Sequence, residues 1–161
     1  MTSLEPQPLT KASFASFGDV VEMDGAEHFT INQGFAERFT DLAHVDIGRE
    51  GGLVNISVVA AKPRPRPIAL QVMERHPLGS QIFYPLQDRP WLVVVCVDPS
   101  DIKSYGAFTA TGRQGVNYAR NTWHHPLLVL DADSRFLVID RQGPGNNLEE
   151  INLGETYAQI A

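Results

Sequence analysis

Residues 74–81 read Glu-Arg-His-Pro-Leu-Gly-Ser-Gln, and they follow an alternating run over Ile68–Met73 that is typical of a β-strand. Side chains two apart on a strand share a face. The even-numbered apolar side chains of this run are therefore predicted to face the same way as Glu74 and His76. An apolar face that becomes ionisable at its end is typical of the wall of a pocket. The stretch predicts a strand that leads into a pocket.

Short strands and frequent turns continue on both sides of this stretch. Trp91–Val97 is apolar at every position, which predicts a central strand covered on both faces. Leu127–Leu130 and Phe136–Asp140 flank a tight turn and predict a hairpin. Pro63–Pro67 predicts a stiff loop, because proline has no N–H for a ladder. Further strands are expected at Val20–Val21, Asp41–Ile47, Leu53–Ala60, Gln81–Pro85 and Ala107–Ala110.

Helical signals are few. Thr10 is a candidate N-cap for one short helix over Lys11–Phe17, which Gly18 ends. Together with the many short strands and the lack of an internal repeat, this predicts an all-β sandwich or barrel with one or two short helices.

Composition limits the class of protein. The chain has 161 residues, 43% of them hydrophobic, which suits a single domain over residues 1–161 with a sizeable core. The net charge of -6 argues against nucleic acid as the main partner. The single cysteine, Cys96, rules out an internal disulfide framework. Since no signal peptide or ~20-residue apolar span is evident, we expect a soluble, cytoplasmic protein without membrane contact.

Candidate metal ligands follow from the spacing Glu74-x-His76-x4-Gln81. This spacing puts two ligand-capable side chains on one strand face and a third on the returning strand, and His124 could supply a fourth. Imidazole, carboxylate and amide oxygen suit a divalent metal such as Ni, Mn or Zn. The alternative is a hydrogen-bonded polar pair at a strand end. His125 adjoins His124, so at most one of the two should face the pocket.

Arginines could bind a carboxylate substrate. The planar guanidinium of Arg38, Arg75 or Arg120 matches a carboxylate, although each could equally be a surface charge. Asn32 has two interpretations: a ligand contact beside Arg38, or a turn former together with Gly34. The chain has no glycine-rich phosphate loop, no Gly-x-Ser-x-Gly elbow and no cysteine cluster for zinc.

Five motifs carry a resemblance to a known family. They are Glu-Arg-His-Pro-Leu-Gly-Ser-Gln (74–81), Gly-Val-Asn-Tyr (115–118), Asn-Thr-Trp-His-His-Pro (121–126), Ile-Asp-Arg (139–141) and the segment 31–38. In order and spacing they resemble the ureidoglycolate lyase family, formerly called ureidoglycolate hydrolase, over nearly the whole chain. The resemblance implies a cupin-like double-stranded β-barrel (jelly roll), usually a homodimer. It also implies conversion of (S)-ureidoglycolate to glyoxylate and urea in allantoin and purine catabolism.

The resemblance also implies a ligand set. In the cupin pattern His-x-His-x4-Glu, Glu74 stands at the first histidine, His76 at the second and Gln81 at the glutamate, while His124 matches the histidine of the second motif. Two of the four ligand types are therefore changed. The implied cofactor is a divalent ion, nickel first, with no organic cofactor. Glu74 or His124 would act as base on the substrate hydroxyl, and His76 would hold the metal or donate a proton.

Substrate contacts are expected from the remaining polar residues. Arg38 or Arg75 would bind the carboxylate of the substrate, and Asn32 and Gln81 would recognise the ureido group. Two other functions stay open: a non-catalytic cupin that binds a small carboxylate, and a different metal-dependent cupin enzyme such as a dioxygenase or isomerase. Lyase and amidohydrolase chemistry on the same substrate are not separated either.

Overall fold

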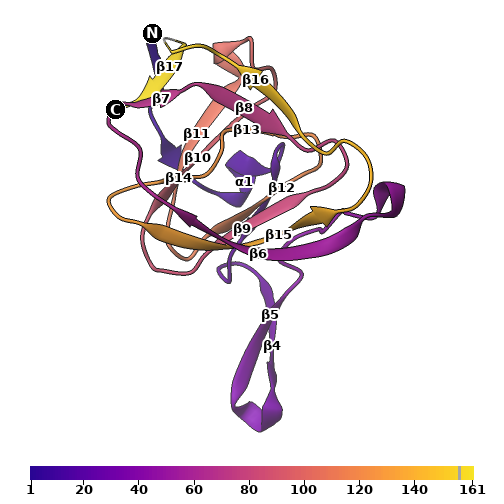
Figure 1. Cartoon of the computed structure of the whole chain (residues 1–161). Helices are drawn as coiled ribbons and strands as arrows, with labels where there is room; N and C mark the ends of the chain where they lie inside the picture. Colours follow the sequence, from indigo (N-terminus) through magenta and orange to yellow (C-terminus); the bar gives the residue numbers. More distant parts are fainter. Residues whose placement is uncertain (156) are drawn as a thin grey trace.

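Two large β-sheets face each other in the computed structural model, which describes residues 1–155 and 157–161 (Figure 1). The order of the seven-stranded sheet is β16 (Glu149–Asn152), β8 (Val72–Arg75), β13 (Trp123–His124), β10 (Trp91–Cys96), β11 (Tyr105–Ala110) and β2 (Gln7–Pro8), with β14 (Leu128–Val129) also on β10. The order of the five-stranded sheet is β3 (Gly18–Val21), β12 (Gly115–Tyr118), β9 (Gln81–Pro85), β15 (Ser134–Gln142) and β6 (Leu53–Ala61).

Smaller elements complete the fold. A three-stranded sheet joins both ends of the chain, in the order β1 (Thr2–Ser3), β17 (Ala158–Ile160) and β7 (Ile68–Leu70). A separate two-stranded hairpin consists of β4 (Glu27–Ile31) and β5 (Ala36–Thr40). The helices are α1 (Lys11–Phe14) and the 3-10 turns η1 (Asn32–Gly34), η2 (Arg49–Gly51) and η3 (Ile102–Ser104). No described helix has the length and apolar content that a membrane span requires.

The core lies on both faces of β10, whose side chains are all buried. Its odd-numbered residues pack between the two large sheets with Phe14 and Phe136, and its even-numbered residues pack in a second cluster on the opposite face. The predicted doubly covered strand is thus confirmed over Trp91–Cys96, whereas Val97 lies beyond its end and is exposed. Thr10 caps α1 as predicted, through a capping box with Ser13, and places Phe14 in the core. The helix itself ends at Phe14 and does not continue to Phe17.

The prediction of an all-β fold is confirmed, with one qualification about closure. Among the described residues, the two large sheets share no hydrogen-bonded ladder, so they form a sandwich and not a closed barrel. The polar ends of β8, β13 and β9 meet in the space between the sheets, where the candidate site lies.

The strand predicted over residues 68–74 is divided at Gln71 between two sheets. The buried side chains of β7 and Met73 pack together in the second cluster, whereas Glu74 faces His124. The expectation that the apolar side chains of β7 share a face with Glu74 is therefore wrong. The break at Gln71 shifts the alternation of faces by one residue. Of the apolar residues predicted to share a face with Glu74, only Val72, two residues before it on β8, still does so.

Two further elements differ from the sequence prediction. Residues 41–47 form no strand, because side chains hold their backbone: the His44 N–H donates to Asp19 and the Asp46 N–H donates to Ser80. The hairpin predicted over residues 127–140 is also absent. β14 pairs with β10, whereas β15 pairs with β6 and β9 in the other sheet. The turn between them crosses from one sheet to the other.

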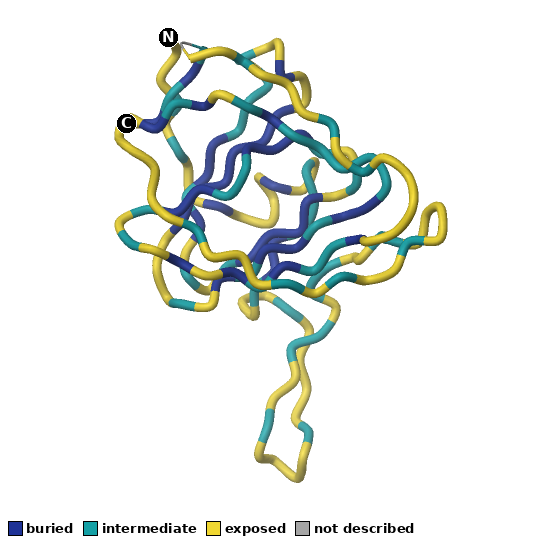
Figure 2. The backbone as a smooth tube through the Cα atoms, in the orientation of Figure 1, coloured by how far each residue is buried: buried dark blue, intermediate teal, exposed yellow. Residues whose placement is uncertain are grey.

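The hairpin of β4 and β5, here called the arm, extends away from the two sheets (Figure 1). Its two strands pair with one another over five residue pairs, and η1 forms its tip. The predicted turn formers Asn32 and Gly34 both lie in this tip, with positive φ. From residue 22 to residue 67 no residue is buried, and Figure 2 shows the whole arm in exposed or intermediate colours.

Candidate metal centre

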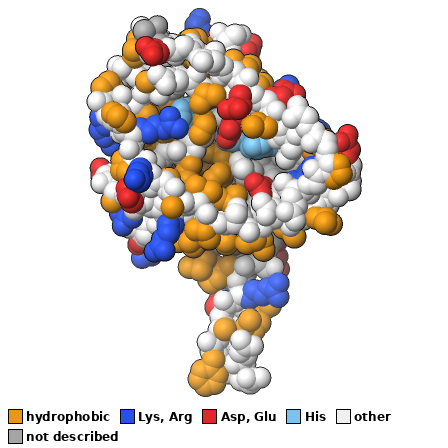
Figure 3. Space-filling view, viewed as in Figure 1, with side chains coloured by type: hydrophobic (Ala, Val, Ile, Leu, Met, Phe, Trp, Pro, Cys, Tyr) orange, Lys and Arg blue, Asp and Glu red, His pale blue; other side chains and the backbone are white. Residues whose placement is uncertain are grey.

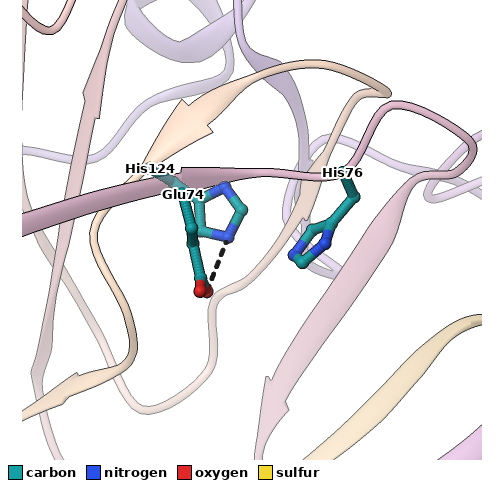
Figure 4. Close-up of side chains that lie close together, drawn as sticks. All are labelled: Glu74, His76 and His124. Carbon is teal, nitrogen blue, oxygen red and sulfur yellow. Dashed lines mark ion pairs between the residues drawn. The ribbon is translucent and has the colours of Figure 1, made fainter. Parts of the chain in front are cut away.

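Three ionisable side chains converge between the sheets (Figure 4). Glu74 lies on β8, His124 pairs with it across the ladder from β13, and His76 follows β8 directly. The ligand-capable atoms of these three side chains lie within 4.8 Å of one another. Neighbouring strands thus present the three side chains to one point.

His124 has a defined tautomer. Its Nδ1–H donates to the backbone oxygen of Thr122 at 2.9 Å, so the neutral ring carries its lone pair on Nε2. This Nε2 is buried, makes no hydrogen bond with protein, and lies 3.4 Å from Glu74 Oε1. Tyr118 stacks on the ring at 4.1 Å and keeps it in place. Two acceptor atoms therefore face each other, an arrangement that calls for a proton or a cation between them.

His76 repeats this arrangement. Its Nδ1–H donates to the backbone oxygen of Asn147 at 2.8 Å, and its Nε2 lies 3.1 Å from Gln81 Oε1. Gln81 directs its carbonyl this way because its Nε2 donates to Asp140 at 3.1 Å. Without a second proton on the imidazole, Nε2 and Oε1 are again two acceptors in contact.

These four side chains fit a divalent cation. Two imidazole nitrogens and a carboxylate converge, and an amide oxygen lies beside one of the imidazoles. Both histidines are oriented through Nδ1 by backbone carbonyls, as metal-ligating histidines usually are. Nitrogen and oxygen donors of this kind suit Ni, Mn or Zn. The buried, unpartnered Nε2 of His124 is the atom that most needs such an ion.

Electrostatics keep the carboxylate charged. Burial acts to raise the pKa of Glu74, but the interaction with His124 and the nearby charge of His76 outweigh it and hold that pKa below its ordinary value. Burial, reinforced by the Glu74 charge, raises the pKa of Tyr118 well above its ordinary value, so Tyr118 stays neutral. The site therefore has an ionised base beside a neutral aromatic wall.

The molecule is hollowed on one face (Figure 3). Hydrophobic side chains form the floor of this hollow, and acidic and histidine side chains lie at its edge. The core cluster between the sheets contains Phe83 and Tyr118, whose rings are in contact edge to face at 6.1 Å. A small polar molecule entering here would meet charged groups on one side and apolar groups on the other.

The other predicted contacts lie elsewhere in the chain. Arg75 is ion-paired with Glu149 at 2.6 Å, and its guanidinium lies 4.5 Å from the ring centre of Trp123. Because neighbours on a strand point in opposite directions, Arg75 faces away from Glu74. Asn32 and Arg38 lie on the arm, which projects away from the site of its own chain. The structure thus brings Gln81 beside His76, whereas Arg75, Asn32 and Arg38 lie away from the three ionisable residues.

Several residues that orient the site had no role in the sequence prediction. Asp140 orients Gln81, the carbonyls of Thr122 and Asn147 orient the two histidines, and Tyr118 supports His124. Asp140 and Tyr118 lie in the motifs Ile-Asp-Arg and Gly-Val-Asn-Tyr, which signalled importance without a role. A backbone carbonyl leaves no such signal, because every residue has one.

Comparison with known proteins agrees with these features. The family model described as ureidoglycolate lyase matches residues 1–160. The chain is similar to ureidoglycolate lyase 1 of Rhizobium meliloti (strain 1021), with 53% identity over 96% of this chain and 91% of that protein. It is similar to the ureidoglycolate lyase of Burkholderia mallei (strain NCTC 10229), with 49% identity over 97% of this chain and 92% of that protein. It is also similar to the ureidoglycolate lyase of Chelativorans sp. (strain BNC1), with 47% identity over 98% of this chain and 96% of that protein.

Similarity to solved structures is more distant. Bacillus subtilis oxalate decarboxylase aligns with 68% of this chain and 30% of its own, at 14% identity and a TM-score of 0.41. Such a score supports no inference about chemistry. The family model, by contrast, matches nearly the full length of the chain, and the relatives align over nearly their full length at about 50% sequence identity. On that basis the chain belongs to the ureidoglycolate lyase family.

Proposed function

We propose that this protein is a ureidoglycolate lyase, which cleaves (S)-ureidoglycolate to glyoxylate and urea. The observation that carries the proposal is the ionised Glu74 beside two oriented imidazoles at the hollow between the sheets. The names of the similar proteins support the choice of substrate. We further propose that the protein acts in allantoin and purine breakdown in the cytoplasm.

The reaction needs one proton moved between two atoms of the substrate. Glu74 takes the proton of the substrate hydroxyl, and the oxygen then forms the carbonyl of glyoxylate. The carbon–nitrogen bond breaks, its electron pair stays on the urea nitrogen, and that nitrogen takes the proton from Glu74. No atom is gained or lost. Positioned acid–base groups of this kind typically contribute about 10²–10⁴-fold to the rate.

The proposed cofactor is a divalent ion, with nickel as the first candidate, held by Glu74, His76, Gln81 and His124. A bound ion would supply charge for the substrate carboxylate and would lower the pKa of the substrate hydroxyl. The protein's own contribution is to hold each imidazole through its Nδ1, so that both Nε2 atoms are aimed at the site. Gln81 can in addition accept a hydrogen bond from the ureido group.

The direct test is incubation with (S)-ureidoglycolate, with glyoxylate and urea both measured and the enzyme-free decay subtracted. We expect equal amounts of the two products. Ammonia and carbon dioxide in place of urea would show amidohydrolase chemistry instead. Unchanged substrate that nevertheless protects the protein against thermal unfolding would favour a non-catalytic carboxylate-binding protein.

The proposed partner is a second copy of the same chain. The arm exposes Phe35 at 92% and Phe29 at 45%, and an isolated two-stranded hairpin is only marginally stable in water. The edge strand β6 exposes Ile56 at 67% and Val58 at 57%. One chain thus carries both an arm with exposed aromatic side chains and an apolar sheet face, which could cover one another in two copies related by a two-fold axis.

A second copy also bears on the remaining predicted contacts. Asn32 and Arg38 could reach a substrate only in the partner's site, because their own arm leads away from Glu74. Arg75 could bind the substrate carboxylate only after parting from Glu149. We therefore propose Asn32 and Arg38 as contacts contributed across the dimer.

A further inference from the structure

Asp140 forms a hydrogen-bonded bridge between two amide side chains. Its Oδ2 accepts from Gln81 Nε2 at 3.1 Å, and its Oδ1 accepts from Asn55 Nδ2 at 3.2 Å. The ladder explains this geometry. Asn55 lies directly opposite Asp140 on the edge strand β6, and Ile139 pairs with Ile82 on the other side, next to Gln81.

A carboxylate at this position decides which end of the Gln81 amide faces the imidazole of His76. An amide has one accepting and one donating end, whereas a carboxylate only accepts. Asp140 therefore attracts the NH₂ end of Gln81 and leaves its carbonyl oxygen 3.1 Å from His76 Nε2. If the amide rotated by half a turn, its NH₂ end would face the site and would repel a cation.

We propose that Asp140 is a positioning residue that holds Gln81 Oε1 toward the metal centre, and that Asn55 holds Asp140 in turn. The inference rests on the cation site of the proposed function and extends it to a strand at the edge of the other sheet. It accounts for the Asp of the Ile-Asp-Arg motif, which contacts neither His76 nor His124. Loss of such an outer contact usually weakens metal binding about 10–100-fold.

The test measures Ni²⁺ affinity without substrate, by competition with a fluorescent chelator. Asp140→Leu should weaken binding about 10–100-fold, because nothing then orients the Gln81 amide. Asp140→Asn alone should weaken it less, since an amide at 140 can present either end. The double variant Asn55→Asp/Asp140→Asn should restore wild-type affinity, because the new carboxylate at 55 attracts the NH₂ end at 140 and leaves a carbonyl for Gln81. Asp131→Leu, at an exposed turn, controls for the lost charge.

The outcomes separate this inference from the proposed function. Wild-type protein that takes up no Ni²⁺ would contradict the cation site and the inference with it. Wild-type binding that Asp140→Leu leaves unchanged, in protein with a normal circular dichroism spectrum, would overturn the inference alone. If Asp140→Leu does not fold, the comparison of the single and double Asn variants still decides. A double variant no tighter than Asp140→Asn would then count against the inference.

Discussion

At the scale of single residues, the centre depends on where each imidazole keeps its proton. Backbone carbonyls of Thr122 and Asn147 accept hydrogen bonds from the Nδ1–H groups of His124 and His76, so both Nε2 atoms point inward. Burial would work against the charge on Glu74, yet the neighbouring imidazoles hold its pKa below the usual range. The two imidazoles that could hold an ion are thus also the groups that keep the proposed base ionised.

Glu74→Gln should lower kcat by about 10²–10⁴-fold, because the amide cannot accept the substrate proton. The measurement is glyoxylate release at saturating substrate. Glu5→Gln, which removes an exposed carboxylate near the N-terminus, is the control and should leave the rate unchanged. Wild-type turnover by folded Glu74→Gln protein would remove Glu74 from the mechanism.

His125 predicts a dependence of stability on pH. Burial lowers the pKa of His125 to about 4, against 6.5 for the free side chain. Above pH 6.5 the folded and unfolded states are both neutral at this residue. As the pH falls from 6.5 toward 4, only the unfolded state takes up a proton, so the free energy of unfolding decreases. Between pH 7 and pH 4.5 the loss should be about 2–3 kcal/mol.

The measurement is urea unfolding of wild type, His125→Phe and His44→Phe at both pH values. Between pH 7 and pH 4.5 the free energy of unfolding of His125→Phe should fall by about 2–3 kcal/mol less than that of wild type. His44 is exposed, so the variant at that position should behave as wild type. An equal loss in all three proteins would show that His125 does not titrate as expected.

At the scale of elements, the arm and β6 both leave apolar side chains exposed. Leu53–Ala61 has the composition of a core strand, yet one of its faces is uncovered within this chain. The arm has no strand partner other than itself in the described sheets. Both features are explained by one cause if a second copy covers them.

Replacing residues 28–39 with Asn-Gly, which joins the paired residues Glu27 and Thr40 through a two-residue turn, should convert a dimer to a monomer. The reason is that the apolar arm would no longer cover the sheet of a second copy. Light scattering after size-exclusion chromatography should give twice the 17.8 kDa chain mass for wild type and the single mass for the variant. Val97→Ser, at an exposed position directly after β10, should remain dimeric. A monomeric wild type would contradict the proposal outright.

At the scale of the whole molecule, the centre connects the two large sheets. Glu74 and His124 belong to the seven-stranded sheet, whereas Gln81 and Asp140 belong to the five-stranded sheet. An ion bound by ligands from both sheets would therefore oppose their separation. Metal binding and unfolding should then be linked.

Ni²⁺ at a hundredfold excess over its Kd should stabilise the fold by about 2.7 kcal/mol. For a chain of this size that corresponds to a rise in Tm of about 5–10 °C. Differential scanning calorimetry with Ni²⁺, and after chelation, measures the shift. His124→Ala should show little or no rise, and a rise equal to that of wild type would place the ion elsewhere.

Much of the fold could be predicted from local pattern. Alternation and turn residues indicated most of the strands, and the uniformly apolar run indicated β10, because these signals depend on near neighbours in sequence. The same alternation, with the family resemblance, singled out Glu74, His76, Gln81 and His124 together. It failed where pairing partners are distant: a break at Gln71 moved the face of β7, and β14 and β15 joined different sheets.

Local sequence pattern was thus enough to predict an all-β protein and the side chains that could bind an ion. The orientation of those side chains follows from contacts between distant parts of the chain. Asp140 reaches Gln81 across 59 residues of sequence, and the Asn147 carbonyl reaches His76 across 71. Only the tertiary structure also showed that the arm leads away from its own site. Contacts of this kind arise from packing of whole sheets, which no local periodicity encodes.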